Sequence, residues 1–290
     1  MVVQQKVYIY YFLKIYKMNE TIIRSLSGLV YISLLIWATL FSRETFLVLF
    51  GLLLLQTVNE FCTLVKLPRI QSIILAAVLY FIFAFFLAQN KFTDFGLIIA
   101  SLFVCFKLMF WLLKDKLLPT IKEENWMNLI GYIILPFIFI TKIPLINDNF
   151  IPSIIIGIFI LIWTNDTFAY VVGKSIGKHK LFESISPKKT IEGFFGGFVF
   201  AILASYLISK YYIEGSITNH YIWIGFAVIV SIFGTIGDLI ESKFKRLANV
   251  KDSGKIMPGH GGILDRLDSV IFVSPFVFLF YQILNYVTFS

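Results

Sequence analysis

Long apolar runs constrain this chain more than any other feature. The stretch SIILAAVLYFIFAFFLA at 72–88 holds no charged residue, and several other runs approach this length. An α-helix needs about 20 apolar residues to cross the roughly 30 Å of hydrocarbon in a bilayer. With 58% hydrophobic and 14% charged residues among 290, the chain has too little polar surface to cover a water-soluble globule. The sequence therefore predicts an integral membrane protein.

The spanning elements are predicted to be helices, because no run shows the alternation of an outer-membrane strand. The fold class is thus an all-α integral membrane protein with about nine transmembrane helices. We place the spans near residues 25–41, 45–65, 70–89, 95–113, 128–146, 150–172, 193–210, 221–240 and 269–288. Pro136 and Pro144 interrupt the fifth span, which makes it the least regular.

The distribution of Lys and Arg predicts the orientation, since cytoplasmic loops collect these residues. With the N-terminus in the cytoplasm, the outer loops hold only Arg43, Lys91, Lys142 and Lys210, and Lys107 lies within a span. The other basic residues all fall in inner loops, which places the C-terminus outside. The net charge of +8 follows from this asymmetry and from contact with anionic lipid, and gives no reason to propose a nucleic-acid partner.

The sequence predicts a single polytopic membrane domain over residues 1–290. Its first 20 residues mix Lys with Tyr, Ile and Phe, which suits an interfacial helix on the inner leaflet better than a cleaved signal peptide. Cys62 and Cys105 fall in apolar spans and are expected to be packing residues. Two long cytoplasmic loops, 173–192 and 241–268, are left to carry the chemistry.

The first of these loops follows a span with a polar end. Asp166 lies among apolar residues, where a carboxylate is costly unless it is paired or metal-bound. Asn165, Asp166 and Thr167 could simply lock helices together by hydrogen bonds, but we favour a polar lining of a substrate cavity. The GKS triplet at 173–175 is not a phosphate-binding P-loop, because the motif requires Gly where Phe168 stands and no strand precedes it.

The same loop continues as SPKKT at 186–190, directly before the glycine-rich helix start GFFGG. Lysines, hydroxyl groups and a helix N-terminus together favour phosphate binding. An ordinary positive cytoplasmic loop would explain the lysines, but it would not explain this turn at the entrance to a helix.

The second loop, together with the end of the span that precedes it, contains two pairs of carboxylates. If the chain is helical there, Asp238 and Glu241 share one face, with Lys245 four residues further on, and Asp265 and Asp268 have the same spacing. Such groups bracketing the flexible PGHGG turn favour a Mg²⁺ site that shares ligands with phosphates. Helix-end solvation with surface ion pairs is the alternative, but it would require no such turn.

The stretch SKFKRLANVKDSGKIMPGHGGILDRLD at 242–268 resembles the signature of phosphatidate cytidylyltransferases, also called CDP-diacylglycerol synthases. The resemblance extends to the Asn165-Asp166 region, to GKSIGKHKL at 173–181 and to SPKKTIEG at 186–193. It covers the C-terminal half, while the N-terminal half is similar only in being apolar and multi-span. Met257 stands where Ile or Leu is expected, and Lys188 where the family often has Gly, which could alter how a phosphate is held.

This resemblance implies that CTP and phosphatidate give CDP-diacylglycerol and pyrophosphate, with Mg²⁺, in a homodimer at the cytoplasmic face of a bacterial-type inner membrane. It implies metal ligation by Asp238, Asp265 and Asp268; a second metal or a monovalent cation stays open. Lys251 and Arg266 are expected to hold phosphates, and Lys189 and Ser186 to bind CTP. The candidate catalytic residues are Asp238, Lys251, Asp252, His260, Asp265, Arg266 and Asp268, and the candidate nucleotide-binding residues are Asp166, Lys174, Ser186, Lys189, Lys245 and Arg246.

His260 has two readings from sequence. It could donate a hydrogen bond to a phosphate or cap a turn, and we favour the first.

Two other functions remain open from sequence. Intramembrane Asp166 and Asp238 could belong to a secondary transporter for an anionic solute, although no internal repeat is apparent. Another CTP-using enzyme acting on a polyprenyl-type lipid would share the same catalytic loop. Dependence on metal and nucleotide separates a transporter from an enzyme, and lipid competition separates the two enzymes.

Overall fold

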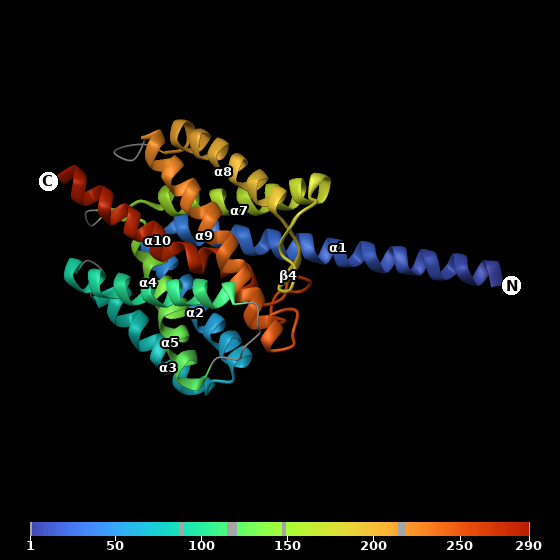
Figure 1. Ribbon diagram of the computed structural model, residues 1–290. Helices are drawn as coiled ribbons and strands as arrows, with labels where there is room; N and C mark the ends of the chain where they lie inside the picture. The colour runs from blue at the N-terminus through green and yellow to red at the C-terminus, as the bar shows by residue number, and fades with distance from the viewer. Residues whose placement is uncertain (1, 87–89, 115–120, 147–148, 214–218, 290) are drawn as a thin grey trace.

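The computed structural model describes residues 2–86, 90–114, 121–146, 149–213 and 219–289 (Figure 1). Over this part of the chain, nine helical segments are long and apolar enough to cross a membrane, as predicted. They are Ile22–Phe41, Arg43–Val65, Arg69–Phe86, Phe92–Leu113, Lys122–Lys142, Pro152–Ile176, Ile191–Tyr211, His220–Leu247 and Leu264–Leu284. The eighth helix extends further at its C-terminal end than the sequence predicts, and the ninth begins earlier at its N-terminal end. Both carboxylate pairs therefore lie in helices. The predicted end of the third span, at 87–89, lies outside the described residues.

The helices are α1 (Val2–Phe41), α2 (Arg43–Val65), α3 (Arg69–Tyr80), η1 (Phe81–Phe86), α4 (Lys91–Leu113), α5 (Lys122–Asn128), η2 (Leu129–Ile134), α6 (Leu135–Lys142), α7 (Pro152–Ile176), α8 (Ile191–Tyr211), α9 (His220–Leu247) and α10 (Leu264–Phe289). The short strands form two antiparallel pairs: β1 (Leu145–Ile146) pairs with β2 (Asn149–Phe150), and β3 (Lys180–Phe182) pairs with β4 (Ser186–Thr190).

The fifth span forms the centre of the bundle. Its π-helical turn η2 directly precedes Pro136, which lacks the N–H that a regular α-helical turn would use. The run is nevertheless helical from Lys122 to Lys142, and Pro144 follows its end. Every residue from 131 to 144 is buried, and the segment packs against α2, α4 and α10. A buried helix that is apolar on all sides is the expected core of a membrane bundle.

Helices α7, α8 and α9 pack against one another, and α10 packs against α9 and α6 (Figure 1). Glycines allow the close approach of α8 to α7: a Cβ atom added at Gly197 would lie 2.6 Å from the backbone oxygen of Asn165. Small residues at helix crossings are the usual means of tight packing in membranes. The glycines of GFFGG thus have a role in helix packing, in addition to the phosphate binding predicted for this helix start and the loop before it.

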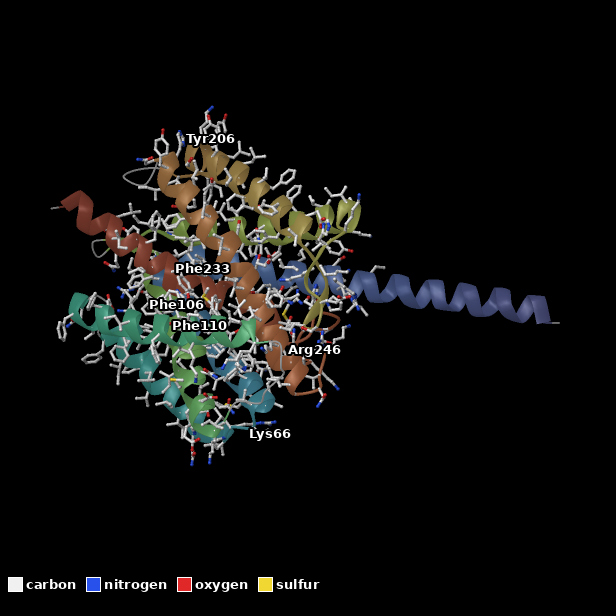
Figure 2. The ribbon with its side chains drawn as sticks, viewed as in Figure 1. Lys66, Phe106, Phe110, Tyr206, Phe233 and Arg246 are labelled. Atoms are coloured by element: carbon white, nitrogen blue, oxygen red, sulfur yellow. The ribbon has the colours of Figure 1, made fainter. Side chains whose placement is uncertain are left out.

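The outer surface carries large apolar side chains. Phe106 and Phe110 lie on α4 (Figure 2), and Phe110 is 69% exposed. Cys62 and Cys105 are buried and free, as expected of packing residues. The backbone of α1 is helical from Val2 and runs past the body of the molecule (Figure 1). The side chains of residues 1–21 lie outside the described part, so the interfacial helix at 1–20 stays a prediction, as does the orientation of the termini.

Candidate active site

A cavity of about 920 Å³ lies where the two long loops meet the helix ends. Its walls come from α1, α7, the β3–β4 hairpin, α8, α9, α10 and the loop before α10. Its charged and ionisable lining residues are Asp166, Lys174, Lys180, Lys188, Lys189, Asp238, His260, Asp265, Arg266 and Asp268. The cavity therefore brings together predicted residues from both loops, with lysines from the first, Asp265 and Asp268 from the second, and Asp166 and Asp238 from the spans that precede them.

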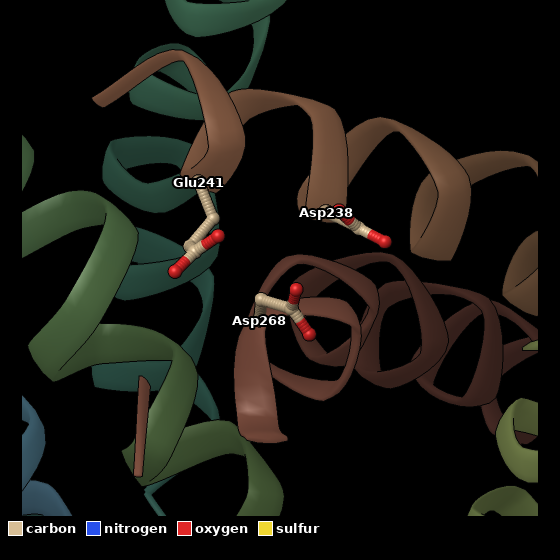
Figure 3. Close-up of side chains that lie close together, drawn as sticks. All are labelled: Asp238, Glu241 and Asp268. Carbon is tan, nitrogen blue, oxygen red and sulfur yellow. The ribbon is translucent and has the colours of Figure 1, made fainter. Parts of the chain in front are cut away.

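Three carboxylates form a compact cluster beside this cavity (Figure 3). Asp238 and Glu241 are three residues apart on α9 and share a face, and Asp268 reaches them from the second turn of α10. One oxygen from each lies within 4.8 Å of the others. Asp238 and Asp268 were predicted as metal ligands, whereas Glu241 was only recognised as sharing a face with Asp238.

Two lysines neutralise part of this negative charge. Lys189 Nζ on β4 lies 2.6 Å from Asp238 Oδ2, and Lys245 Nζ lies 2.5 Å from Glu241 Oε2. Ser242 Oγ donates a hydrogen bond to Asp238 Oδ1. Glu241 is only 1% exposed, and its Oε1 atom has no hydrogen-bond partner among the described residues. A buried carboxylate oxygen without a donor is costly, so this cluster is suited to a bound cation.

Asp265 lies outside this cluster, and the protein provides donors to both of its oxygens. Oδ2 accepts hydrogen bonds from the backbone N–H of Ser253 at 2.8 Å, the Ser253 hydroxyl at 2.8 Å and the N–H of Gly262 at 2.7 Å. Oδ1 lies 2.6 Å from Lys245 Nζ. Four donors around one carboxylate are typical of a group that organises a loop. Lys245 therefore bridges Asp265 and Glu241.

The β3–β4 hairpin is held at the cavity by contacts with α8 and α9. Thr190 caps α8, accepting a hydrogen bond from the N–H of Gly193 at its side-chain oxygen. Arg246 on α9 donates from Nε to the backbone oxygen of Ile185 and from Nη1 to that of Val250. Arg246, which we predicted to bind nucleotide, thus makes its contacts with the two loops. Ser186 is half-buried at the start of β4.

Five predicted residues are not part of the cavity lining: Ser186, Lys245, Arg246, Lys251 and Asp252. Lys251 and Asp252 are exposed in the loop that follows α9, and neither lines the cavity. Their predicted roles remain predictions.

The first span contributes a wall that the sequence did not indicate. Gly28 and Tyr31 of α1 line the cavity, and Ser27 Oγ lies 2.7 Å from Nδ1 of His260. The backbone oxygens of Arg24 and Pro258 each lie 3.0 Å from the same hydroxyl. The serine has a single hydroxyl proton, so the tautomer of His260 decides whether Nδ1 accepts this proton or donates to Ser27. Nothing in the apolar sequence of α1 signals a partner more than 200 residues away.

Burial lowers the pKa of His260 below its usual value, and the positive charges of Arg266 and Arg24 lower it further. An unfolded His has a pKa of about 6.5, so the stabilising contribution of neutral His260 is fully present above about pH 6.5. It is lost as the pH falls through the lower folded-state value. We expect acidification from about pH 7 to pH 5 to lower the unfolding midpoint of the wild type more than that of His260→Gln. Thermal unfolding in detergent measures both, and equal decreases would contradict this expectation.

In the described part of the chain, nine helices are long and apolar enough to span a membrane, and five of them, α1, α7, α8, α9 and α10, contribute to a cavity with acidic and basic side chains. These features define a polytopic membrane protein whose site suits a charged ligand. The chain belongs to the cytidylyltransferase family, whose model matches residues 22–284.

Three curated relatives, each bearing the name phosphatidate cytidylyltransferase, are similar to part of the chain. The protein of Staphylococcus aureus strain COL is 54% identical over 117 residues, that of Staphylococcus epidermidis strain RP62A 50% and that of Staphylococcus haemolyticus strain JCSC1435 49%. Each match covers 40% of this chain and 44% of the relative, so the chain matches less than half the length of these proteins.

Proposed function

We propose that this protein is a phosphatidate cytidylyltransferase, which joins CTP to phosphatidate and releases pyrophosphate. One observation carries the proposal: a carboxylate cluster and a lysine-bearing hairpin face one cavity at the ends of apolar helices. A nucleotide requires the cations, and a lipid substrate requires the position beside the bilayer. Membership of the cytidylyltransferase family and the names of the relatives support the same reaction.

The residues present fit a divalent cation. Asp238, Glu241 and Asp268 offer only oxygen ligands, which Mg²⁺ prefers, and the Oε1 atom of Glu241 has no donor within the described chain. These three residues would hold the ion. When bound, it would neutralise charge on the phosphates and polarise them.

The reaction needs alignment more than activation of a nucleophile. An oxygen of the phosphatidate phosphate forms a bond with the α-phosphorus of CTP, and the bond from that phosphorus to the bridging oxygen of pyrophosphate breaks. Lys188 and Lys189 of the hairpin and Lys174 of α7 bind the triphosphate, and Arg266 faces the same cavity from α10. Such fixed cations stabilise the negative charge that develops on the leaving pyrophosphate.

The proposal also specifies the membrane in which the enzyme lies and the side on which its cavity opens. The cavity would open on the cytoplasmic side of a bacterial inner membrane, where CTP is found, with the N-terminus inside and the C-terminus outside. The charge distribution of the loops supports this orientation. We also propose a homodimer, as the family resemblance implies.

Transfer of label from α-labelled CTP into lipid tests the proposal. Purified protein with phosphatidate and Mg²⁺ should yield labelled lipid and an equal amount of pyrophosphate, and omission of Mg²⁺ should stop both. Label that enters a polyprenyl phosphate but not phosphatidate would change the lipid substrate. Label in neither lipid would contradict an enzymatic function and favour a transporter, which solute flux into liposomes would then test.

A further inference from the structure

A buried carboxylate outside the cavity lining contacts the loop that precedes α10. Glu60 lies on α2, is 3% exposed and lies within hydrogen-bond distance of four donor groups. Its Oε1 atom accepts from Gln56 Nε2 at 2.9 Å and from the backbone N–H of Ile263 at 3.1 Å. Its Oε2 atom accepts from the N–H of Leu264 at 2.8 Å and lies 3.1 Å from the Ser253 hydroxyl, for whose single proton it competes with Asp265 Oδ2 at 2.8 Å. Three of these donors lie more than 190 residues away in sequence.

The hydrogen bonds from the N–H groups of Ile263 and Leu264 to Glu60 fix the beginning of α10. The helix begins at Leu264, and the first N–H groups of any helix have no partner within the helix. Glu60 supplies acceptors for the N–H groups of Ile263 and Leu264 from a different span, and its negative charge lies at the positive end of the helix dipole. Asp268 is four residues into α10, so the position of this helix start also sets the position of Asp268.

The contact between Glu60 and Ser253 connects α2 to residues that pair with the carboxylate cluster. Ser253 Oγ lies within hydrogen-bond distance of both Glu60 and Asp265. Asp265 pairs with Lys245, and Lys245 pairs with Glu241 of the cluster. Continuous polar contacts therefore join α2 to the candidate metal ligands.

Two glycines of the loop leave room for the Glu60 side chain. A Cβ atom added at Gly254 would lie 2.6 Å from Glu60 Oε1, and one added at Gly262 would collide with Oε2. The second glycine of the GG pair is therefore required by the approach of a carboxylate from α2. The sequence of the loop and that of α2 fit each other at this point.

We propose that Glu60 is a positioning residue of the active site, whose carboxylate sets the place of the 248–263 loop and of the α10 start, and through them of Asp265 and Asp268. This role rests on the proposed function. A purely structural role in packing α2 against α10 would affect stability but not turnover by folded protein.

The test compares Glu60→Gln with Glu44→Gln, which changes an exposed glutamate on the same helix. Glutamine keeps the volume of the side chain but replaces one acceptor oxygen by an NH₂ group facing donors. We expect kcat to fall by about 10- to 100-fold, the size typical of groups that orient ligating residues, with the KM for CTP changing much less. Hydrogen exchange of the full-length protein without substrate should show loss of protection at residues 253 and 263–264. The Glu44 variant should match the wild type in both measurements.

Ser253→Ala provides a second route if Glu60→Gln does not fold. It removes only the link between Glu60 and Asp265, and it should lower kcat while leaving the backbone bonds at 263–264 protected. Wild-type kcat in either folded variant, or unchanged exchange in Glu60→Gln, would overturn the proposal. A wild-type protein without transferase activity would contradict the proposed function instead, and the exchange data would still decide whether Glu60 holds the loop.

Discussion

Replacing Asp268 by Asn should lower turnover by about 10²–10³-fold, the loss seen when one preorganised electrostatic group is removed from an active site. Asp268 lies in the cluster with Asp238 and Glu241, and the substitution removes one negative charge with almost no change in volume. The remaining two carboxylates would hold Mg²⁺ more weakly. Label transfer at increasing Mg²⁺ measures the effect, and the variant should need more Mg²⁺ for half of its maximal rate.

The thermal stability of Asp268→Asn without Mg²⁺, unlike its turnover, should not decrease. Three carboxylates within 4.8 Å repel one another, so removing one charge should leave the unfolding midpoint without Mg²⁺ equal to that of the wild type or higher. The stabilisation that added Mg²⁺ gives the wild type should shrink in the variant, because a ligand that binds only the folded state stabilises in proportion to its affinity. Glu44→Gln serves as the control. An active Asp268→Asn variant with a normal Mg²⁺ requirement would remove Asp268 from the metal site.

Local patterns predicted the helical fold and part of the site. Apolar length gave the spans, because crossing a bilayer sets a narrow length requirement that each segment meets alone. Spacing on α9 also placed Asp238 and Glu241 on one face, as the structure confirms. These features depend on residues a few positions apart, which helix geometry relates directly.

The features that sequence reasoning missed depend on distant contacts. Glu60 and Ser27 act on the 248–263 loop from spans that carry no motif, and both contacts join residues at least 193 positions apart. A signal for Glu60 was nevertheless present, because an ionisable residue inside an apolar span is uncommon and suggests a function. Ser27 offered no such signal. Ser27 is a neighbour of the site only because α1 lies against the loop before α10, and Glu60 only because α2 packs beside α10.

Asp265 and Asp268 show that two carboxylates three residues apart can have different surroundings. Asp265 and Asp268 are three residues apart, and the resemblance implied that both ligate metal. The structure places Asp265 in the first turn of α10, where loop N–H groups point at its side chain, and Asp268 in the next turn, where α9 carries the other carboxylates. Which donors surround a carboxylate depends on the path of the loop, and spacing alone does not give that path.

Replacing Asp265 by Asn should therefore destabilise the protein as well as reduce its activity. The Asp265 side chain is 4% exposed and pairs with Lys245, which is 12% exposed. Breaking a buried ion pair from one side typically costs about 3–5 kcal/mol, because the remaining charge stays buried. The variant should unfold at lower temperature, lose protection from hydrogen exchange at residues 253 and 262, and turn over more slowly. The Mg²⁺ requirement of the molecules that remain folded should stay close to that of the wild type.

A double-mutant cycle with Lys245→Met separates loop positioning from metal ligation. If Asp265 and Lys245 act as a pair, the loss of stability in the double variant should be smaller than the sum of the two single losses, since the second substitution removes the charge left unpaired by the first. Unfolding midpoints of the four proteins without Mg²⁺ provide this comparison. An Asp265→Asn variant with wild-type stability but a raised Mg²⁺ requirement would contradict the loop role and return Asp265 to the metal site, as the sequence implied.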